Sequence, residues 1–329
     1  MLKVKKGPNA QKALNFTMKW GTVLAIIFLF ALFSILMPET FLKADNIVTV
    51  LRNISITAII AIGLTFPLTV GGFDMSVGSA ATVADSLIMS LFVWYGLSSG
   101  LSIVMTLIIV TIVGAVNSLL IVKFKIPDSL ATLAVMFIFE GVAMTYSGGG
   151  SISENMTKMD GTPTTGLMPE SFKLLGATPW IIILMIVVVA FAHFFLKYTK
   201  YGRYMYAVGG NQEAAKLAGI PVGRYKALAY FMSSFFAGLG GIVLCSRVGS
   251  FQINAGAAYL MPAIAASYVG LSVGGDGKAS AIGTFVGAML IGLLENGLVM
   301  MSVPYYSLNI VKGVVLSLAL ASTFIRNKH

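Results

Sequence analysis

The chain has 329 residues, of which 57% are hydrophobic and only 10% are charged, and its mean hydropathy is +0.90. A soluble domain carries about 25% charged residues, so this composition excludes a water-soluble globule. The net charge of +10 does not indicate a nucleic-acid partner, because the basic residues lie in short loops between apolar runs. A single cysteine, Cys245, excludes an intrachain disulfide and a multi-cysteine metal site, and we expect no cofactor in this chain.

Long apolar runs divide the chain into about ten predicted transmembrane helices. A helix needs about 18 or more apolar residues to cross ~30 Å of hydrocarbon. The first run follows five lysines and has no small-residue cleavage site, so we expect an uncleaved helix that starts in the cytoplasm. The predicted helices are residues 20–37, 47–70, 76–95, 101–122, 129–146, 179–196, 227–246, 257–274, 279–301 and 307–325.

The predicted fold is an all-α polytopic membrane protein with a single transmembrane domain over residues 1–329. Basic residues follow the fourth, sixth and tenth predicted spans, which are the cytoplasmic ends if the chain starts inside. This pattern predicts a cytoplasmic N-terminus of about residues 1–19 and a cytoplasmic C-terminus. It also predicts a large extracellular loop at 147–178 and a cytoplasmic loop at 197–226.

A weak internal similarity favours an inverted repeat. Residues 114–129 and 287–306 both run from Gly-Ala through an apolar segment containing Asn to a Pro, and they lie five predicted spans apart. Copies separated by five spans point in opposite directions, which is a recurring transporter architecture. We therefore expect a five-plus-five inverted repeat, with chance similarity between apolar helices as the alternative.

The stretch GGFDMSVGSAATVAD, residues 71–85, places an acidic residue at membrane depth between two predicted spans. Asp74 is expected to act either as the N-cap of the following helix or as part of a broken helix that lines a water-filled route. The two roles are compatible, since a cap at membrane depth needs a polar cavity.

Other polar residues are scattered through the predicted spans, and an intramembrane acid is a functional candidate by default. For each acid, a structural role near a helix end stays open beside a role in the pathway. The candidates for the translocation pathway are Asp74, Ser76, Asn117, Glu140 and Asn296.

The segment GGNQEAAKLAGIPVGRYK, residues 209–226, predicts a short helix between two spans. Asn211 is a suitable N-cap, Glu213 lies in the first turn, Gly219 suits the C-terminal stop, and Pro221 prevents continuation. A helix of about two turns is unstable alone and needs a surface to dock on. We expect that surface to be a cytoplasmic partner, with a lipid-facing amphipathic helix as the alternative. The expected exposed apolar side consists of Ala215, Leu217, Ala218 and Ile220.

Three motifs carry a resemblance to a known family. EAAKLAG (213–219) resembles the EAA-then-Gly loop of permease subunits of bacterial ABC importers. GGFDMSVGS (71–79) is similar to a motif of the ribose-type, or simple-sugar, branch, and residues 260–298 resemble the C-terminal region of that branch. The resemblance covers about residues 45–325, with the motifs in the order of the family.

The resemblance implies a permease subunit of the bacterial cell membrane and not an enzyme. Two ATP-binding cassette subunits would hydrolyse ATP on the cytoplasmic face, and an extracellular solute-binding protein would deliver a monosaccharide such as ribose, or autoinducer-2. A second permease copy would complete a homodimer or heterodimer within the membrane lipid. The residues implied in coupling to the ATPase are Asn211, Glu213, Ala214, Ala215 and Gly219.

Two other functions compete with this interpretation. An ion-coupled secondary carrier would use Asp74, Glu140 and Glu295 for protons, although these acids are scattered rather than clustered. An intramembrane serine protease would need a base near its serine, but His193 is the only internal histidine and no Gly-x-Ser-x-Gly motif accompanies it.

Overall fold

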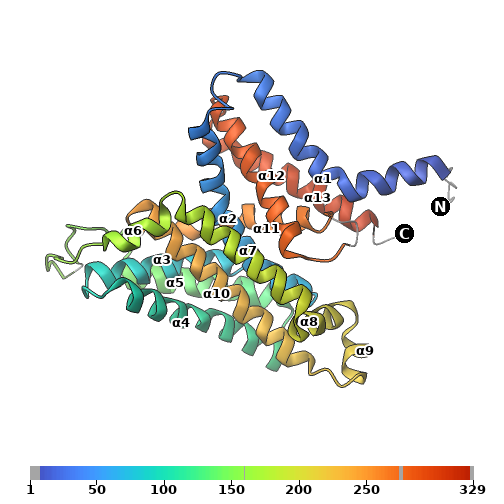
Figure 1. Ribbon diagram of the computed structural model, residues 1–329. Helices are drawn as coiled ribbons and strands as arrows, with labels where there is room; N and C mark the ends of the chain where they lie inside the picture. The colour runs from blue at the N-terminus through green and yellow to red at the C-terminus, as the bar shows by residue number, and fades with distance from the viewer. Residues whose placement is uncertain (1–7, 159, 274–276, 327–329) are drawn as a thin grey trace.

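A computed structural model describes residues 8–158, 160–273 and 277–326 (Figure 1). Within these ranges the chain is helical apart from its connections and two isolated antiparallel bridges. The α-helices are α1 (Pro8–Leu36), α2 (Ala44–Thr69), α3 (Val77–Val93), α4 (Ser99–Ser118), α5 (Asp128–Ser147), α6 (Glu170–Gly176), α7 (Trp180–Tyr198), α8 (Lys200–Gly210), α9 (Gln212–Leu217), α10 (Val222–Val248), α11 (Leu260–Gly270), α12 (Ala281–Met300) and α13 (Leu308–Arg326). The short segments are a π-helix, η1 (Leu119–Lys123), and two 3₁₀ helices, η2 (Ala255–Tyr259) and η3 (Tyr305–Ser307).

Six helices of the described chain are long and apolar enough to cross a membrane: α2, α4 with η1, α5, α7, α10 and α12. Shorter apolar helical stretches lie at Trp20–Leu36, Val77–Val93, Ala255–Gly270 and Leu308–Ser317, where the remaining spans were predicted. The all-helical membrane class is therefore confirmed. The count of ten spans and the inverted repeat stay predictions.

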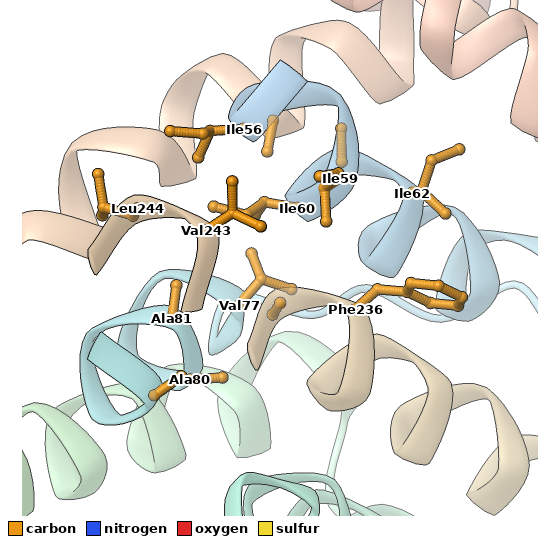
Figure 2. Packing of buried hydrophobic residues seen from close by; sticks show 14 of the residues in the cluster. Ile56, Ile59, Ile60, Ile62, Val77, Ala80, Ala81, Phe236, Val243 and Leu244 are labelled. Carbon is orange, nitrogen blue, oxygen red and sulfur yellow. The ribbon is translucent and has the colours of Figure 1, made fainter. Parts of the chain in front are cut away.

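The core is built around α2 and α10. Every residue of α2 from Ile54 to Pro67 is buried, as expected for a helix that is apolar on all sides. Figure 2 shows isoleucines of α2 packed with residues of α3 and α10, including Ala81 and Val243. The rings of Phe66 on α2 and Phe236 on α10 stack with their centroids 5.5 Å apart. This block fixes the positions of α2, α3 and α10 relative to one another.

Small residues let these three helices approach closely. A Cβ atom at Gly63 of α2 would lie 2.7 Å from the carbonyl oxygen of Ser233 on α10. A Cβ atom at Gly241 of α10 would overlap the carbonyl oxygen of Ala81 on α3. Backbones in such contact pack without intervening side chains, which is the usual way that membrane helices associate tightly.

The helices α3, α4, α5, α7 and α10 run side by side, with α6 at one end of this bundle and α8 and α9 at the other (Figure 1). The predicted large loop at 147–178 and the predicted loop at 197–226 therefore lie at opposite ends. This arrangement agrees with a chain that crosses the membrane between them.

Three predicted loops or termini contain helices that the sequence analysis did not expect. Residues 147–178 include α6, which packs through Phe172, and residues 197–226 include α8 as well as the start of α10. The N-terminal segment 1–19 is helical from Pro8 onwards. Polar composition favoured loops there. The helices α6 and α8 pack on α7 and α10, and α8 also has a side-chain cap, because Thr199 Oγ1 accepts a hydrogen bond from Gly202 N at 3.2 Å.

Candidate functional site

The chain leaves helical geometry between α2 and α3, deep among buried side chains. The helix α2 ends at Thr69, Gly71 adopts a left-handed conformation with φ of +75°, and α3 begins at Val77. Asp74 lies within this break and is 0% exposed. A buried carboxylate requires hydrogen-bond donors, because leaving it unpaired in a low-dielectric interior costs several kcal/mol.

Those donors come from three elements of the fold. Asp74 Oδ1 accepts hydrogen bonds from Ser76 N at 2.8 Å and Ser76 Oγ at 2.6 Å, and Oδ2 accepts one from Ser233 Oγ of α10 at 2.7 Å. Asn117 Nδ2 of α4 donates to Ser76 Oγ at 2.8 Å and lies 3.5 Å from Asp74 Oδ1. We call Asp74, Ser76, Asn117 and Ser233 the Asp74 cluster; all four are buried.

The prediction that Asp74 is the N-cap of the following helix is wrong. Ser76 occupies the N-cap position of α3, and its side chain makes no capping hydrogen bond. Asp74 instead bonds the backbone N–H two residues on, the geometry of an Asx turn, which orders the break before the helix starts. Thr132 Oγ1 of α5 accepts from Met75 N at 3.1 Å and holds the same segment from another side.

The structure brings together three of the five pathway candidates, Asp74, Ser76 and Asn117. The other two lie elsewhere: Glu140 is partly buried on α5, and Asn296 Nδ2 donates to Asn46 Oδ1 at 3.1 Å. No hydrogen bond or ion pair of the described residues joins either one to the Asp74 cluster. The pathway role of all five stays a prediction.

Sequence analysis missed Ser233, which supplies the hydrogen bond from α10. The available signal was the Ser-Ser pair at 233–234 inside an otherwise apolar span.

A cavity of about 500 Å³ lies beside the break and is lined in part by Gly72, Phe73 and Tyr268. Two of its lining residues form an ion pair: Lys226 Nζ, at the start of α10, lies 3.8 Å from Asp128 Oδ1, at the start of α5. Both side chains are mostly shielded from solvent. The cavity combines polar groups with an aromatic ring next to non-helical backbone, an arrangement found where a polar route meets a helix break.

The short helix α9 forms as the sequence predicted. Asn211 Oδ1 accepts a hydrogen bond from Ala214 N at 2.9 Å, which is the expected N-cap. Gly219 has φ of +78°, and Ile220 N donates to Ala215 O at 3.0 Å, which closes the C-terminal end. A residue with a side chain is strained at this φ, so glycine is favoured there.

The surface of α9 and its C-terminal stop differs from the prediction at two residues. Ile220 is only partly exposed and packs against the core. Ala215 is buried against the rest of the chain, so it does not belong to an exposed apolar side. Leu217 is 89% exposed, and Glu213 and Ala214 are also exposed. One side of α9 therefore packs on its own chain, while the other presents an apolar side chain outward.

The preceding helix α8 connects α9 to the interior. The backbone of Gly209 lies directly against Thr69 and Gly71, so close that a Cβ atom there would overlap the Thr69 carbonyl oxygen. Tyr206 Oη donates to Ala279 O at 2.7 Å, just before α12. Burial raises the pKa of Tyr206 to about 12, which keeps this hydroxyl protonated and donating at neutral pH. Through α8, the helix α9 is therefore connected to both the α2–α3 break and the start of α12.

The geometry is that of a multi-pass helical membrane protein with a broken helix at its centre and a capped helix at one end. Sequence comparison defines the family: the profile described as branched-chain amino acid transport system / permease component matches residues 46–320. The chain belongs to this family of transport permeases.

Within this family, the chain is similar to curated permeases for sugars. The ribose import permease protein RbsC of Haemophilus influenzae is 34% identical over 95% of this chain and 96% of its own length. The RbsC protein of Bacillus subtilis is 34% identical over 97% of both chains, and that of Escherichia coli K12 is 33% identical over 92% of this chain and 94% of its own. The xylose transport system permease protein XylH of E. coli K12 is 28% identical over 95% of this chain and 93% of its own. No solved structure matches the chain significantly.

The Asp74 cluster generates a stability prediction. Replacing Asp74 by Leu strands the Ser76 N–H and removes the acceptor for Ser233, and a buried unsatisfied donor costs about 1–3 kcal/mol. We expect a clearly lower unfolding temperature in detergent, measured by intrinsic fluorescence. Asp74→Asn should lower the unfolding temperature less, because its amide oxygen still accepts a hydrogen bond. The exposed Asp45 provides the control, since Asp45→Leu should change the unfolding temperature little. An Asp74→Leu protein as stable as the native chain would contradict the structural role.

Proposed function

We propose that this chain is the transmembrane permease subunit of an ATP-driven ABC importer for a monosaccharide such as ribose. The observation that carries the proposal is the similarity to ribose import permeases over 92–97% of this chain. The more distant similarity to a xylose permease supports a pentose-sized sugar as the substrate class. Autoinducer-2, a small furanose-type molecule within the same branch, is the alternative substrate.

The proposed importer has more than one kind of chain. Two ATP-binding cassette subunits would bind ATP, so this chain itself would need no cofactor. An extracellular solute-binding protein would deliver the sugar, and a second permease copy, identical or different, would complete the membrane part in a bacterial cell membrane. The substrate route is proposed to run beside the α2–α3 break, where the Asp74 cluster and the adjacent cavity bring polar groups into the membrane interior.

Coupling to ATP is proposed to occur through α9. Leu217 is an 89% exposed apolar side chain on a six-residue helix, and a helix this short gains stability by docking. An ATP-binding subunit seated on α9 would bury Leu217 and contact Glu213. Its motion would pass through Gly209 of α8 to Thr69 and Gly71 at the break. ATP can shift the permease between two states only if it favours the subunit arrangement of one of them.

The experiment uses the native chain reconstituted in proteoliposomes with its ATP-binding and solute-binding partners. Uptake of labelled ribose should require ATP on the side of the ATP-binding subunits, and loaded binding protein should stimulate ATP hydrolysis. Leu217→Glu places a charge at the proposed docking surface, so we expect at least a tenfold loss of stimulated hydrolysis and uptake with normal membrane insertion.

Leu217→Met is the matched control, because it keeps an apolar side chain of similar volume and should retain most of the activity. Full uptake by Leu217→Glu would rule out α9 as the docking element. Uptake driven by an ion gradient without ATP would instead establish the ion-coupled carrier.

The proposed orientation places the N- and C-termini and α9 in the cytoplasm and the predicted large loop at 147–178 outside. Basic residues on α7, α8 and α9 favour this assignment, since they gather at one end of the bundle (Figure 1). The two ends can be labelled separately because Met156 and Gln212 are both exposed, while the native Cys245 is buried.

In intact cells, Met156→Cys should react with a membrane-impermeant thiol reagent, and Gln212→Cys should react only after the cells are opened. Mass spectrometry of the labelled protein measures both. The reverse pattern would overturn the orientation.

A further inference from the structure

A second cavity, distinct from the one beside the α2–α3 break, lies where α7, α8 and the start of α12 meet. Its volume is about 400 Å³, within the range of ~300–1,000 Å³ typical of ligand pockets. We call it the basic pocket, because four of its polar lining residues carry or can carry positive charge. Its polar lining residues are His193, Lys197, Arg203, Tyr206, Lys278 and Ser280.

The charges in the basic pocket converge from separate parts of the chain. Lys197 lies in the last turn of α7, Arg203 lies on α8, and Lys278 precedes α12. All three line the cavity and are exposed. Among the described residues, none of the three lies within ion-pair distance of a carboxylate. Arg203 Nη1 donates to the Tyr198 carbonyl at 3.3 Å, which leaves most of its N–H groups for another acceptor. Asp276, the acid nearest in sequence to Lys278, lies outside the described residues.

The basic pocket lies near the end of a candidate membrane span. The helix α7 is a candidate membrane span, and Phe191 and Phe194 are exposed along it. Exposed tyrosines follow at Tyr198, Tyr201 and Tyr204, where α7 runs into α8 (Figure 1). Tyrosines and lysines at a span end are typical of the membrane–water interface, where anionic lipids concentrate cations near their phosphates.

We propose that the basic pocket binds a phosphate-bearing anion, supplied by an anionic phospholipid headgroup or by free phosphate. The guanidinium of Arg203 can donate two parallel hydrogen bonds to phosphate oxygens, while Lys197 of α7 and Lys278 before α12 contribute point charges. Basic pockets between membrane helices are suited to anionic headgroups. The orientation proposed above decides only which leaflet of the membrane the pocket faces. Binding of the anion does not depend on which sugar is carried.

A bound anion would link α8, which leads into α9, to the transmembrane helices α7 and α12. It would bridge α7 and α8 to the segment before α12, next to the hydrogen bond from Tyr206 to Ala279. Neutralising three neighbouring cations would also remove their mutual repulsion. The anion would therefore stabilise the packing of α8 against α7, and α9 directly follows α8 in the chain.

The test measures binding by the purified full chain in detergent, using native mass spectrometry. We expect retention of phosphatidylglycerol but not of phosphatidylcholine. Two neutralised charges near a membrane surface weaken binding by about thirtyfold, so this is the expected effect of the double variant Arg203→Gln with Lys278→Gln. Lys43→Gln, an exposed lysine between α1 and α2, carries the same kind of change and should leave binding unaltered.

A second arm separates the two sources of phosphate. If inorganic phosphate binds with the same dependence on Arg203 and Lys278 while phosphatidylglycerol does not, the ligand is a soluble anion. If neither ligand binds, or the double variant and Lys43→Gln bind alike, the proposal is overturned.

A measurement on the native chain keeps the test independent of variant folding. In vesicles containing phosphatidylglycerol, Lys197 and Lys278 should react several-fold more slowly with an amine reagent than in phosphatidylcholine vesicles, with Lys43 as the internal reference. Addition of inorganic phosphate to the phosphatidylcholine vesicles reports the soluble source in the same way. Equal relative rates under all three conditions would contradict binding at this pocket.

Discussion

The carboxylate of Asp74 holds together the part of the structure on which the rest depends. It is fully buried, and it remains acceptable there only because Ser76 and Ser233 donate to both of its oxygens. Each such hydrogen bond contributes about 0.5–1.5 kcal/mol net, whereas a buried polar group left without a partner costs about 1–3 kcal/mol. These hydrogen bonds hold the α2–α3 break against α10, and the bond from Asn117 to Ser76 holds it against α4 as well. They therefore determine where α3 begins.

The break also lies between the proposed substrate route and the proposed site of coupling to ATP. The cavity with the Lys226–Asp128 ion pair lies on one side of it, and the backbone of Gly209 presses on Thr69 and Gly71. Because α8 continues directly into α9, a docked ATP-binding subunit and the polar interior are separated by one short helix. Close-packed backbones transmit strain, and in the proposed mechanism this contact is what would carry motion from α9 to the break.

Features set by local sequence were predictable, and those set by distant contacts were not. Apolar runs placed the six long apolar helices within about five residues at each end, and Asn211 with Gly219 gave both ends of α9. The Ser-Ser pair at 233–234 was visible in the sequence, but Ser233 lies 159 residues from Asp74, so no local pattern could show that the two side chains are hydrogen-bonded. The helices α6 and α8 were missed for the same reason: their sequences are short and polar, and their stability comes from packing on α7 and α10.

The most direct test of this account is amide hydrogen exchange of the assembled transporter, measured with and without ATP in peptides that cover residues 66–73 and 207–217. The account predicts that binding of the ATP-binding subunits slows exchange in 207–217. It further predicts that ATP then changes exchange in both peptides together, since Gly209 and Thr69 are in contact. A change confined to 207–217, with residues 66–73 exchanging identically in both states, would contradict transmission from α9 to the α2–α3 break.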